Sequence, residues 1–368
     1  MVLMGGFMAS CSSSKAEQPE PLAHSNVFVP GEYDSQFYRI PAIATAANGD
    51  LIAVADKRIE SNGDLPGKID VVCRRSTDGG VTWSDYITVA EHNEDGGYGD
   101  PALVIDRNTG DVIVISTHGN GLWQDAPGHT AISRSHDGGL TWEAPVDVAE
   151  MICVGENAPL KNVVGAFASS GAATQLSTGR IMFVLVTRFK DVENFSCYAV
   201  YSDDGGVTWK VSENPGTTNG DESKLVELAD GSVLMSIRNR YKGKRIFSRS
   251  TDGGVTWSEP WETDLIDPAC NGDILRYTAD GKDLLLQSLP GSPDQRVDVT
   301  IYASSDNGQT WPDKYVVTEL PSAYSAMTVL PNGNIGILTE EELNPEEKNR
   351  FTLVFDEVPL DSIVAPAK

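Results

Sequence analysis

Eight residues with ionisable or phenolic side chains recur at similar distances from a series of glycine-containing turns. Arg39 and Asp100 each lie 10 residues before such a glycine, and Glu222 and Tyr324 each lie 9 residues before one. Four more lie 7 to 15 residues after a glycine: Arg58, Asp64, Arg238 and Arg296. Arginines bind carboxylates through paired hydrogen bonds, whereas acids and phenols transfer protons or attack carbon. In a chain of net charge −25, this set predicts a cationic pocket for an anion, with a carboxylate favoured. The alternative is that each residue is simply a solvated strand end.

The elements that must position these residues are repeated along the chain. Six glycines lie 50 to 69 residues apart, each followed by a short apolar run: Gly49, Gly110, Gly179, Gly231, Gly281 and Gly333. An eight-residue motif, Ser-x-Asp-x-Gly-x-Thr-Trp, follows each of the first five, at residues 76–83, 135–142, 202–209, 250–257 and 304–311. A period of this length with several short strands is typical of propeller blades. We therefore predict an all-β fold, a six-bladed β-propeller of four-stranded antiparallel blades.

The sixth unit has no such motif, but it contains a strand-like run at residues 350–355. We expect the segment before Gly49 to supply the missing strand and close the ring. In each blade the glycine turn would join the first two strands, and the motif would join the last two. Both turns then lie on one face of the ring, so the eight candidate residues meet on the other face.

The repeated motif itself is predicted to be structural. Its Asp-Gly-Gly or Asp-Asn-Gly segment forms a tight turn with residues at positive φ. Serine, aspartate and threonine side chains can bond to backbone groups within such a turn, and the tryptophan can pack between neighbouring sheets. Because the motif is repeated five times, we assign a shared folding role, not catalysis, to its aspartates: Asp78, Asp137, Asp204, Asp252 and Asp306.

The composition excludes several other classes of protein. The excess of 53 Asp and Glu over 28 Lys and Arg argues against a nucleic-acid partner, because an acidic surface repels polyphosphate. No apolar run reaches the ~18–20 residues that span a bilayer. The five cysteines form no Cys-x-x-Cys pair and the five histidines no His-Glu-x-x-His motif, which argues against a disulfide scaffold or a zinc site. We predict no metal and no organic cofactor.

The N-terminal residues 1–25 are assigned to a leader and linker, and residues 26–368 to a single propeller domain. A short apolar stretch with small residues ends at Cys11, and a polar, proline-containing segment follows. This resembles the end of a bacterial lipoprotein signal, in which the cysteine carries a lipid anchor. The alternatives are a mis-assigned start and a disordered tail. The lipoprotein interpretation predicts a periplasmic, outer-membrane or secreted protein, which we expect to be a monomer.

Two of these patterns together identify a family. The sequence Phe-Tyr-Arg-Ile-Pro at residues 37–41 resembles the Arg-Ile-Pro signature of sialidases (neuraminidases), and the repeated motif resembles their Asp box. The resemblance extends from about residue 26 to residue 361. It implies a bacterial exo-α-sialidase, a retaining glycoside hydrolase that acts on sialylated glycans, glycoproteins or glycolipids.

The resemblance also implies a role for each candidate residue. Three arginines would bind the carboxylate of sialic acid: Arg39, Arg238 and Arg296. Tyr324 matches the nucleophile, Glu222 the carboxylate that activates it, and Asp64 the acid and base. Further substrate contacts are implied for Arg58 and Asp100, and Glu340 would support Arg39.

A tyrosine nucleophile has a physical reason, since sialidases are an exception to the two-carboxylate rule of glycosidases. The anomeric carbon of sialic acid carries a carboxylate, which would repel an anionic nucleophile, whereas a phenol is neutral until it attacks. Two alternatives remain open. One is an intramolecular trans-sialidase or another transglycosylase that uses the same residues. The other is a sialic-acid-binding scaffold without activity, which has no need of a nucleophile and its base. Trp123 lies in a loop-like stretch and could line the site or be a surface aromatic.

Overall fold

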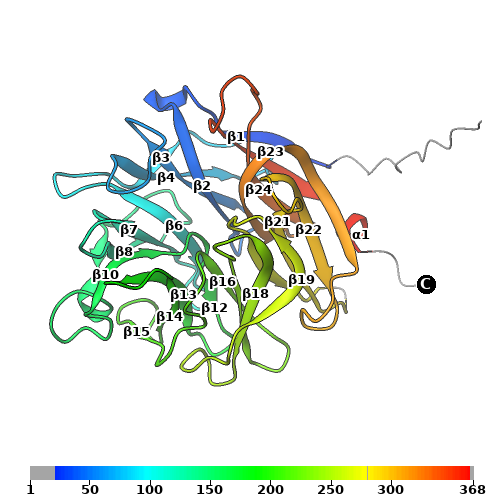
Figure 1. Ribbon diagram of the computed structural model, residues 1–368. Helices are drawn as coiled ribbons and strands as arrows, with labels where there is room; N and C mark the ends of the chain where they lie inside the picture. The colour runs from blue at the N-terminus through cyan, green and yellow to red at the C-terminus, as the bar shows by residue number, and fades with distance from the viewer. Residues whose placement is uncertain (1–20, 280, 365–368) are drawn as a thin grey trace, which may run out of the picture.

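The computed structural model describes residues 21–279 and 281–364, and this part of the chain is built almost entirely of β-strands. Its only helical segments are two short 3-10 turns and one short helix: η1 (Glu32–Asp34), η2 (Ala149–Met151) and α1 (Leu360–Ile363). In Figure 1 the colours follow one another around the molecule from blue to red. No described helix is long and apolar enough to cross a membrane. The all-β prediction is therefore confirmed.

Four of the sheets contain four or five strands each. The first has the order β2 (Phe37–Thr45), β3 (Leu51–Arg58), β4 (Ile69–Ser76), β5 (Ile87–Ala90). The second has the order β11 (Gly171–Ala172), β6 (Tyr98–Ile105), β7 (Val112–His118), β8 (His129–Ser135), β9 (Val146–Asp147). The third has the order β10 (Val163–Ala168), β13 (Ile181–Phe189), β14 (Ser196–Ser202), β15 (Lys210–Val211), with β12 (Thr174–Gln175) paired to β13. The fourth has the order β16 (Ser223–Glu227), β17 (Val233–Ile237), β18 (Gly243–Ser250), β19 (Trp261–Asp267).

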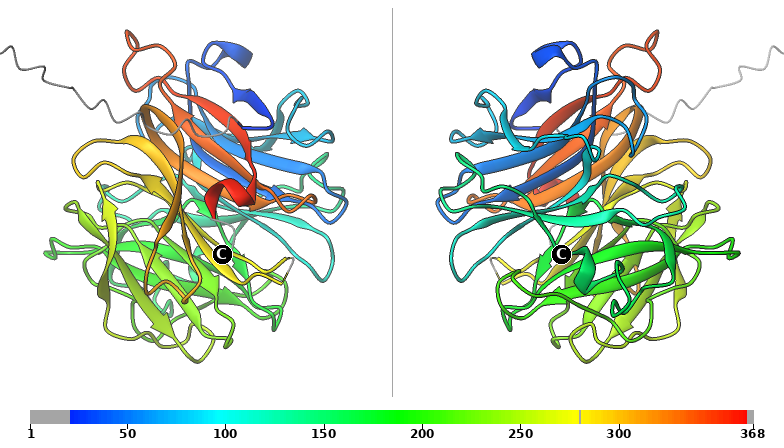
Figure 2. Two further views of the ribbon diagram at one scale, coloured as in Figure 1. Left: turned by 90° about the vertical axis from the view of Figure 1, so that its right-hand side faces the viewer. Right: turned by 90° about the vertical axis from the view of Figure 1, so that its left-hand side faces the viewer.

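The remaining seven strands form one sheet that joins the two ends of the chain. Its order is β1 (His24–Phe28), β25 (Thr352–Val358), β24 (Ile335–Glu341), β23 (Asp313–Val329), β22 (Val297–Ser304), β21 (Leu284–Pro290), β20 (Asp273–Tyr277). The long strand β23 pairs with β22 through its first half and with β24 through its second half. The N-terminal strand β1 pairs with β25, as the closing strand was predicted to do. Figure 2 shows the blue and red ends of the chain together from both sides.

The two kinds of turn occupy the predicted positions. The repeated glycines lie between paired antiparallel strands, for example Gly49 between β2 and β3 and Gly231 between β16 and β17. Each eight-residue motif begins at the last residue of β4, β8, β14, β18 or β22. The third unit differs, because β13 pairs with two short strands, β10 and β12, and the intervening β11 pairs with β6 of the second sheet. Gly171 lies at this interruption with φ of 98°, and a Cβ there would meet Cε of the buried Lys224 at 2.9 Å.

The motif aspartates hold their own turns. In residues 135–142, Oδ1 of Asp137 accepts hydrogen bonds from the Ser135 hydroxyl at 2.8 Å and the Thr141 N–H at 2.9 Å. The Thr141 hydroxyl donates to the other oxygen. The equivalent serine and threonine bonds recur at the other four copies. The repeated motif is thus a self-contained turn.

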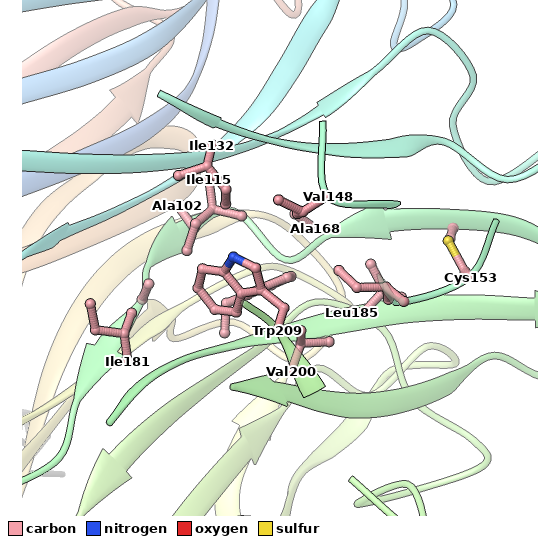
Figure 3. Close-up of a cluster of buried hydrophobic side chains, with 14 of the residues drawn as sticks. Ala102, Ile115, Ile132, Val148, Cys153, Ala168, Ile181, Leu185, Val200 and Trp209 are labelled. Atoms are coloured by element: carbon pink, nitrogen blue, oxygen red, sulfur yellow. The ribbon is translucent and has the colours of Figure 1, made fainter. Parts of the chain in front are cut away.

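The motif tryptophan joins neighbouring sheets. Trp209 is 4% exposed and packs in a cluster that contains Ile115 and Ile132 of the second sheet and Leu185 and Val200 of the third. Figure 3 shows its indole ring among these apolar side chains. Burial of such a large ring between sheets contributes strongly to stability.

The first strand of the described chain begins near the predicted domain boundary. Strand β1 begins at His24, two residues before the predicted start of the domain. Nδ1 of the His24 ring lies within hydrogen-bond distance of Oδ1 of Asp356, at 2.8 Å. The Leu22 N–H also donates to the Glu357 carbonyl at 2.9 Å. Cys11 and most of the predicted leader lie outside the described residues, so the lipid anchor stays a prediction.

Candidate active site

A pocket of about 310 Å³ opens at the ends of the sheets opposite the motif turns. Seven of the nine residues predicted for the site line this pocket: Arg39, Asp64, Asp100, Glu222, Arg238, Arg296 and Tyr324. The two others lie behind it, because Arg58 contacts Asp64 and Glu340 contacts Arg39. None of the five motif aspartates lines the pocket.

Two β-bulges direct the backbone at the start of the first and second sheets. The register between β2 and β3 shifts between Arg39 and Ala42, and that between β6 and β7 shifts between Gly99 and Ala102. The residue before proline has positive φ in both bulges, 62° at Ile40 and 56° at Asp100. A bulge re-aims the side chains around it. A β-branched residue at positive φ is strained, so the surrounding contacts must hold Ile40 in place.

Glu340 supplies those contacts. Its side chain is fully buried, and Oε1 accepts hydrogen bonds from Nε of Arg39 and the N–H of Ile40, both at 2.7 Å. Its other oxygen accepts the N–H of Tyr324 at 3.1 Å. One carboxylate therefore fixes the bulge at Arg39 and the backbone of Tyr324 relative to each other.

Three guanidinium groups converge on Tyr324. The guanidinium carbons of Arg39 and Arg296 lie 5.3 Å and 5.8 Å from the centre of its ring. Nη1 of Arg238 donates to its hydroxyl oxygen at 3.2 Å. Arg296 is itself held by the carbonyl of Ala269, which accepts from Nη2 at 2.7 Å. The site therefore presents three cations around one phenol.

The phenol nevertheless stays neutral near pH 7. Burial raises the pKa of Tyr324 well above its usual 10.0, and the nearby Glu222 raises it further. The three arginines act in the opposite direction, since positive charge favours the phenolate.

Glu222 shares one nitrogen with this phenol. The carboxylate is 3% exposed, and its Oε2 accepts a hydrogen bond from Nη1 of Arg238, the same atom that bonds to Tyr324. Among the hydrogen bonds of the described residues, none joins Glu222 to the Tyr324 hydroxyl directly. In this arrangement Arg238 lies between the two groups.

Asp221 is a pocket residue that the sequence reasoning missed. It lines the pocket, its Oδ2 lies 3.9 Å from Nε of Arg238, and burial raises its pKa. A signal was present, because Asp221 lies 10 residues before Gly231, the same distance that selected Arg39 and Asp100.

Asp64 lies on the loop between β3 and β4 and is held by Arg58. Its side chain is 79% exposed, and Nη2 of Arg58 lies 2.8 Å from its Oδ1. Arg58 is 1% exposed and also donates to the carbonyl of Asn62 at 2.7 Å. Asp56, a second residue missed by the sequence reasoning, lies 3.1 Å from Nη2 of Arg58. Its position two residues before Arg58, on the same face of β3, was the available signal.

Burial disfavours the charged forms of two acids near this loop, Asp56 and Asp100. Burial raises the pKa of Asp56 to about 6, and its Oδ1 accepts the N–H of Asp100 at 3.1 Å. Burial also raises the pKa of Asp100 well above 3.8, and the neighbouring Asp56 and Asp64 raise it further. Such perturbed acids in a pocket are typical of functional sites.

An apolar wall closes one side of the pocket. It contains Leu122, Trp123, Phe167 and Phe195. Trp123 is 67% exposed and meets Phe195 edge to face at 5.4 Å between ring centres. Of the two interpretations of Trp123, the structure supports the one that lines the site. Phe195 carried no signal in the sequence, because its loop has no repeated counterpart.

Within the described residues no group of three or more His, Cys, Asp or Glu side chains is arranged to hold a metal ion. The four described cysteines are free and buried: Cys73, Cys153, Cys197 and Cys270.

Comparison with known proteins identifies the family. Residues 49–337 match the family described as "BNR repeat-like domain". The chain is 34% identical over 347 residues to a sialidase of Micromonospora viridifaciens, covering 87% of this chain and 52% of that protein. It is 30% identical over 285 residues to a sialidase of Clostridium perfringens, covering 72% of each. The chain belongs to the sialidase family of BNR-repeat proteins.

Solved structures show the same fold. The Hadza microbial sialidase Hz136 superposes with a TM-score of 0.84 at 29% identity, covering 93% of this chain and 69% of that one. A leech intramolecular trans-sialidase superposes with a TM-score of 0.78 at 18% identity, covering 94% and 71%. The chain spans 52% and 61% of the lengths of two curated relatives, the Micromonospora viridifaciens and Bacteroides fragilis sialidases.

Proposed function

We propose that this protein is an exo-α-sialidase, a retaining glycoside hydrolase that releases terminal sialic acid from glycoconjugates. The observation that carries the proposal is the convergence of Arg39, Arg238 and Arg296 on the buried Tyr324. Membership of the sialidase family supports it. Three guanidinium groups form a site for one carboxylate, and sialic acid carries that carboxylate on its anomeric carbon.

Binding of the carboxylate orients the sugar. Charge-assisted, paired hydrogen bonds from arginines fix both the position and the plane of a carboxylate. Because Tyr324 lies among the same guanidinium groups, a carboxylate held there brings the anomeric carbon next to the phenol. Such positioning supplies a large part of the rate of an enzymatic reaction.

The first chemical step forms a sialosyl–tyrosine. The Tyr324 oxygen attacks the anomeric carbon as the bond to the aglycone oxygen breaks. Asp64, on its exposed loop, protonates that leaving oxygen, and Glu222 accepts the phenol proton. In the second step Asp64 takes a proton from water, and the water oxygen bonds to the anomeric carbon as the bond from that carbon to the Tyr324 oxygen breaks. The released phenolate regains its proton from Glu222. Two displacements give net retention.

Competition between Glu222 and the substrate carboxylate for Arg238 couples substrate binding to the activation of Tyr324. Glu222 and Tyr324 both bond to Nη1 of Arg238. A substrate carboxylate that binds Arg238 competes with Glu222 for it, and the released Glu222 is then available to the phenol proton. The base is thus freed when substrate is present.

Product analysis separates this function from its alternative, an intramolecular trans-sialidase that uses the same residues. The experiment follows an aryl sialoside by NMR. The α-anomer of free sialic acid should appear first and then equilibrate. An anhydro sugar as the main product supports the trans-sialidase, and the β-anomer first, or no turnover, contradicts the proposal. The Tyr324→Phe protein is the matched control.

We also propose that the chain forms a six-bladed β-propeller. The division of β23 between two partners separates the seven-stranded sheet into two four-stranded groups, and β1 completes the last one. With the other four sheets this makes six units around one pocket. A crystal structure with fewer or more than six units around the pocket would contradict the blade count. The periplasmic, outer-membrane or secreted location stays a prediction.

A further inference from the structure

A fully buried ion pair lies outside the pocket, against backbone next to two of its arginines. Nη1 of Arg245, on β18, lies 3.1 Å from Oδ2 of Asp267 at the end of β19, and both side chains are 0% exposed. Neither residue lines the pocket. Burying two charges is costly unless every polar atom is satisfied, so the partners of this pair show what it does.

Asp267 bonds to two separate stretches of backbone. Its Oδ2 accepts the N–H of Asn239 at 2.9 Å, and its Oδ1 accepts the N–H of Cys270 at 3.1 Å. Arg245 completes the arrangement, because Nη1 donates to the carbonyl of Cys270 at 3.2 Å and Nε donates to the Ser236 hydroxyl at 2.9 Å.

One stretch carries an arginine of the pocket, and the other accepts a hydrogen bond from one. Asn239 directly follows Arg238. Cys270 directly follows Ala269, whose carbonyl accepts the bond from Arg296 at 2.7 Å. Ala269 has φ of 58°, which is unfavourable for a residue with a Cβ, so its conformation depends on surrounding contacts.

We propose that Arg245 and Asp267 are positioning residues that hold Arg238 and Arg296 in the geometry that binds the substrate carboxylate. This inference rests on the proposed function. The third arginine is independent of the pair, because Arg39 is held by Glu340. Disturbing the pair should therefore weaken recognition of the carboxylate in part and leave contacts to the rest of the sugar unchanged.

The experiment uses the full chain and two probes that differ only at the carboxylate. These are 2,3-unsaturated N-acetylneuraminic acid and its methyl ester, and calorimetry gives the affinity for each. In the Asp267→Asn protein the preference for the acid over the ester should fall by about tenfold, the scale of one charge-assisted hydrogen bond. Affinity for the ester should stay within about twofold of wild type, well under 1 kcal/mol.

Two further variants exclude a general loss of stability. Asp106 is also a buried aspartate, 2% exposed and bonded to Gln175 at 2.7 Å, but it lies at the opposite ends of the strands. Asp106→Asn should leave the acid-to-ester preference unchanged. Arg245→Lys keeps a charge beside Asp267 but shortens the reach to Cys270. It should reduce the preference less than Asp267→Asn, and it replaces that variant if Asp267→Asn does not fold.

The outcomes separate this inference from the proposed function. If the wild-type protein binds acid and ester equally, the proposed carboxylate site is wrong, and so is the positioning role that depends on it. A wild-type preference that survives unchanged in folded Asp267→Asn or Arg245→Lys protein overturns the positioning role alone. An equal loss for acid and ester shows that the pair acts through stability, which also overturns it.

Discussion

The aspartates at the two ends of the sheets lie in opposite environments. In the motif turns, the Thr141 hydroxyl and N–H are the main groups that lower the pKa of Asp137, to about 2. In the pocket, burial raises the pKa of Asp100 and Asp221 above 3.8, and neighbouring acids add to the effect. Thus the same side chain is stabilised as an anion at one end of the molecule and destabilised as an anion at the other.

The difference shows how repetition and function divide the molecule. A motif carboxylate accepts its hydrogen bonds from donors within its own turn. Because it depends on no other part of the molecule, the same turn can occur five times in the fold. A carboxylate or phenol that is buried with incomplete compensation is prepared to exchange protons or bind a ligand. At the pocket end the repeated positions therefore carry different residues, such as Arg39, Asp100 and Tyr324. The following changes test this division, from the largest expected effect to the smallest.

Replacing the nucleophile should have the largest effect. Tyr324→Phe keeps the ring between the arginines but removes the attacking oxygen, so turnover of an aryl sialoside should fall by roughly 10⁴-fold or more, as when other enzymes lose a nucleophile. Affinity for a sialic acid analogue should change little. Steady-state kinetics and calorimetry measure the two quantities. Near-normal turnover would remove Tyr324 from this role.

Replacing the acid should discriminate between leaving groups. Asp64→Ala should slow cleavage of a glycan substrate by about 10²–10⁴-fold, the usual contribution of general acid catalysis. The loss of the first step should be far smaller for an aryl sialoside, because its leaving group needs no proton. Pre-steady-state rates on both substrates provide the measurement. Equal losses on the two would argue against acid catalysis by Asp64.

Replacing one arginine should weaken binding without abolishing it. Arg296→Ala should reduce affinity for a sialic acid analogue by about 1.5–3 kcal/mol, the contribution of a hydrogen bond to a charged group. The methyl ester of the same analogue serves as the control and should lose less. Unchanged affinity for the acid would show that Arg296 does not bind the carboxylate.

Replacing a motif aspartate should affect stability alone. Asp137→Asn should lower the free energy of unfolding by about 1 kcal/mol, since it weakens the bonds to Thr141, and leave kcat unchanged. Urea denaturation and kinetics measure these effects. A fall in kcat as large as that of Asp64→Ala would contradict the assignment of a purely structural role to the motif aspartates.

The same variant has a signature in pH. The folded-state pKa of Asp137 is about 2, below the ~3.9 of an unfolded aspartate. Its stabilising contribution is therefore complete above about pH 4 and is lost as the pH falls towards 2. Between pH 4 and 2, wild type should lose more stability than Asp137→Asn. Parallel denaturation curves across this range would contradict the lowered pKa.

The repeated parts of the molecule were predictable from the sequence, because their bonds are local. The turns at the repeated glycines and the motif positions follow from residues close together in the chain. The closing strand pairs with the distant β25, and it was predictable because the sixth repeat lacks its own last strand. The bulges at Ile40 and Asp100 were not predictable, since distant carboxylates hold them, as Glu340 holds Ile40. The same applies to the pair of Arg245 and Asp267, whose partners come together only in the folded sheets.

Chemical trapping on Tyr324 tests the central claim most directly. In the Asp64→Ala protein an aryl sialoside can still release its aglycone, but water lacks its base, so the sialosyl–enzyme should accumulate. After acid quench, peptide mass spectrometry should find one sialic acid on the peptide that contains Tyr324, and none in the Asp64→Ala, Tyr324→Phe double variant. An adduct on another residue, or an adduct that persists in the double variant, would contradict the account.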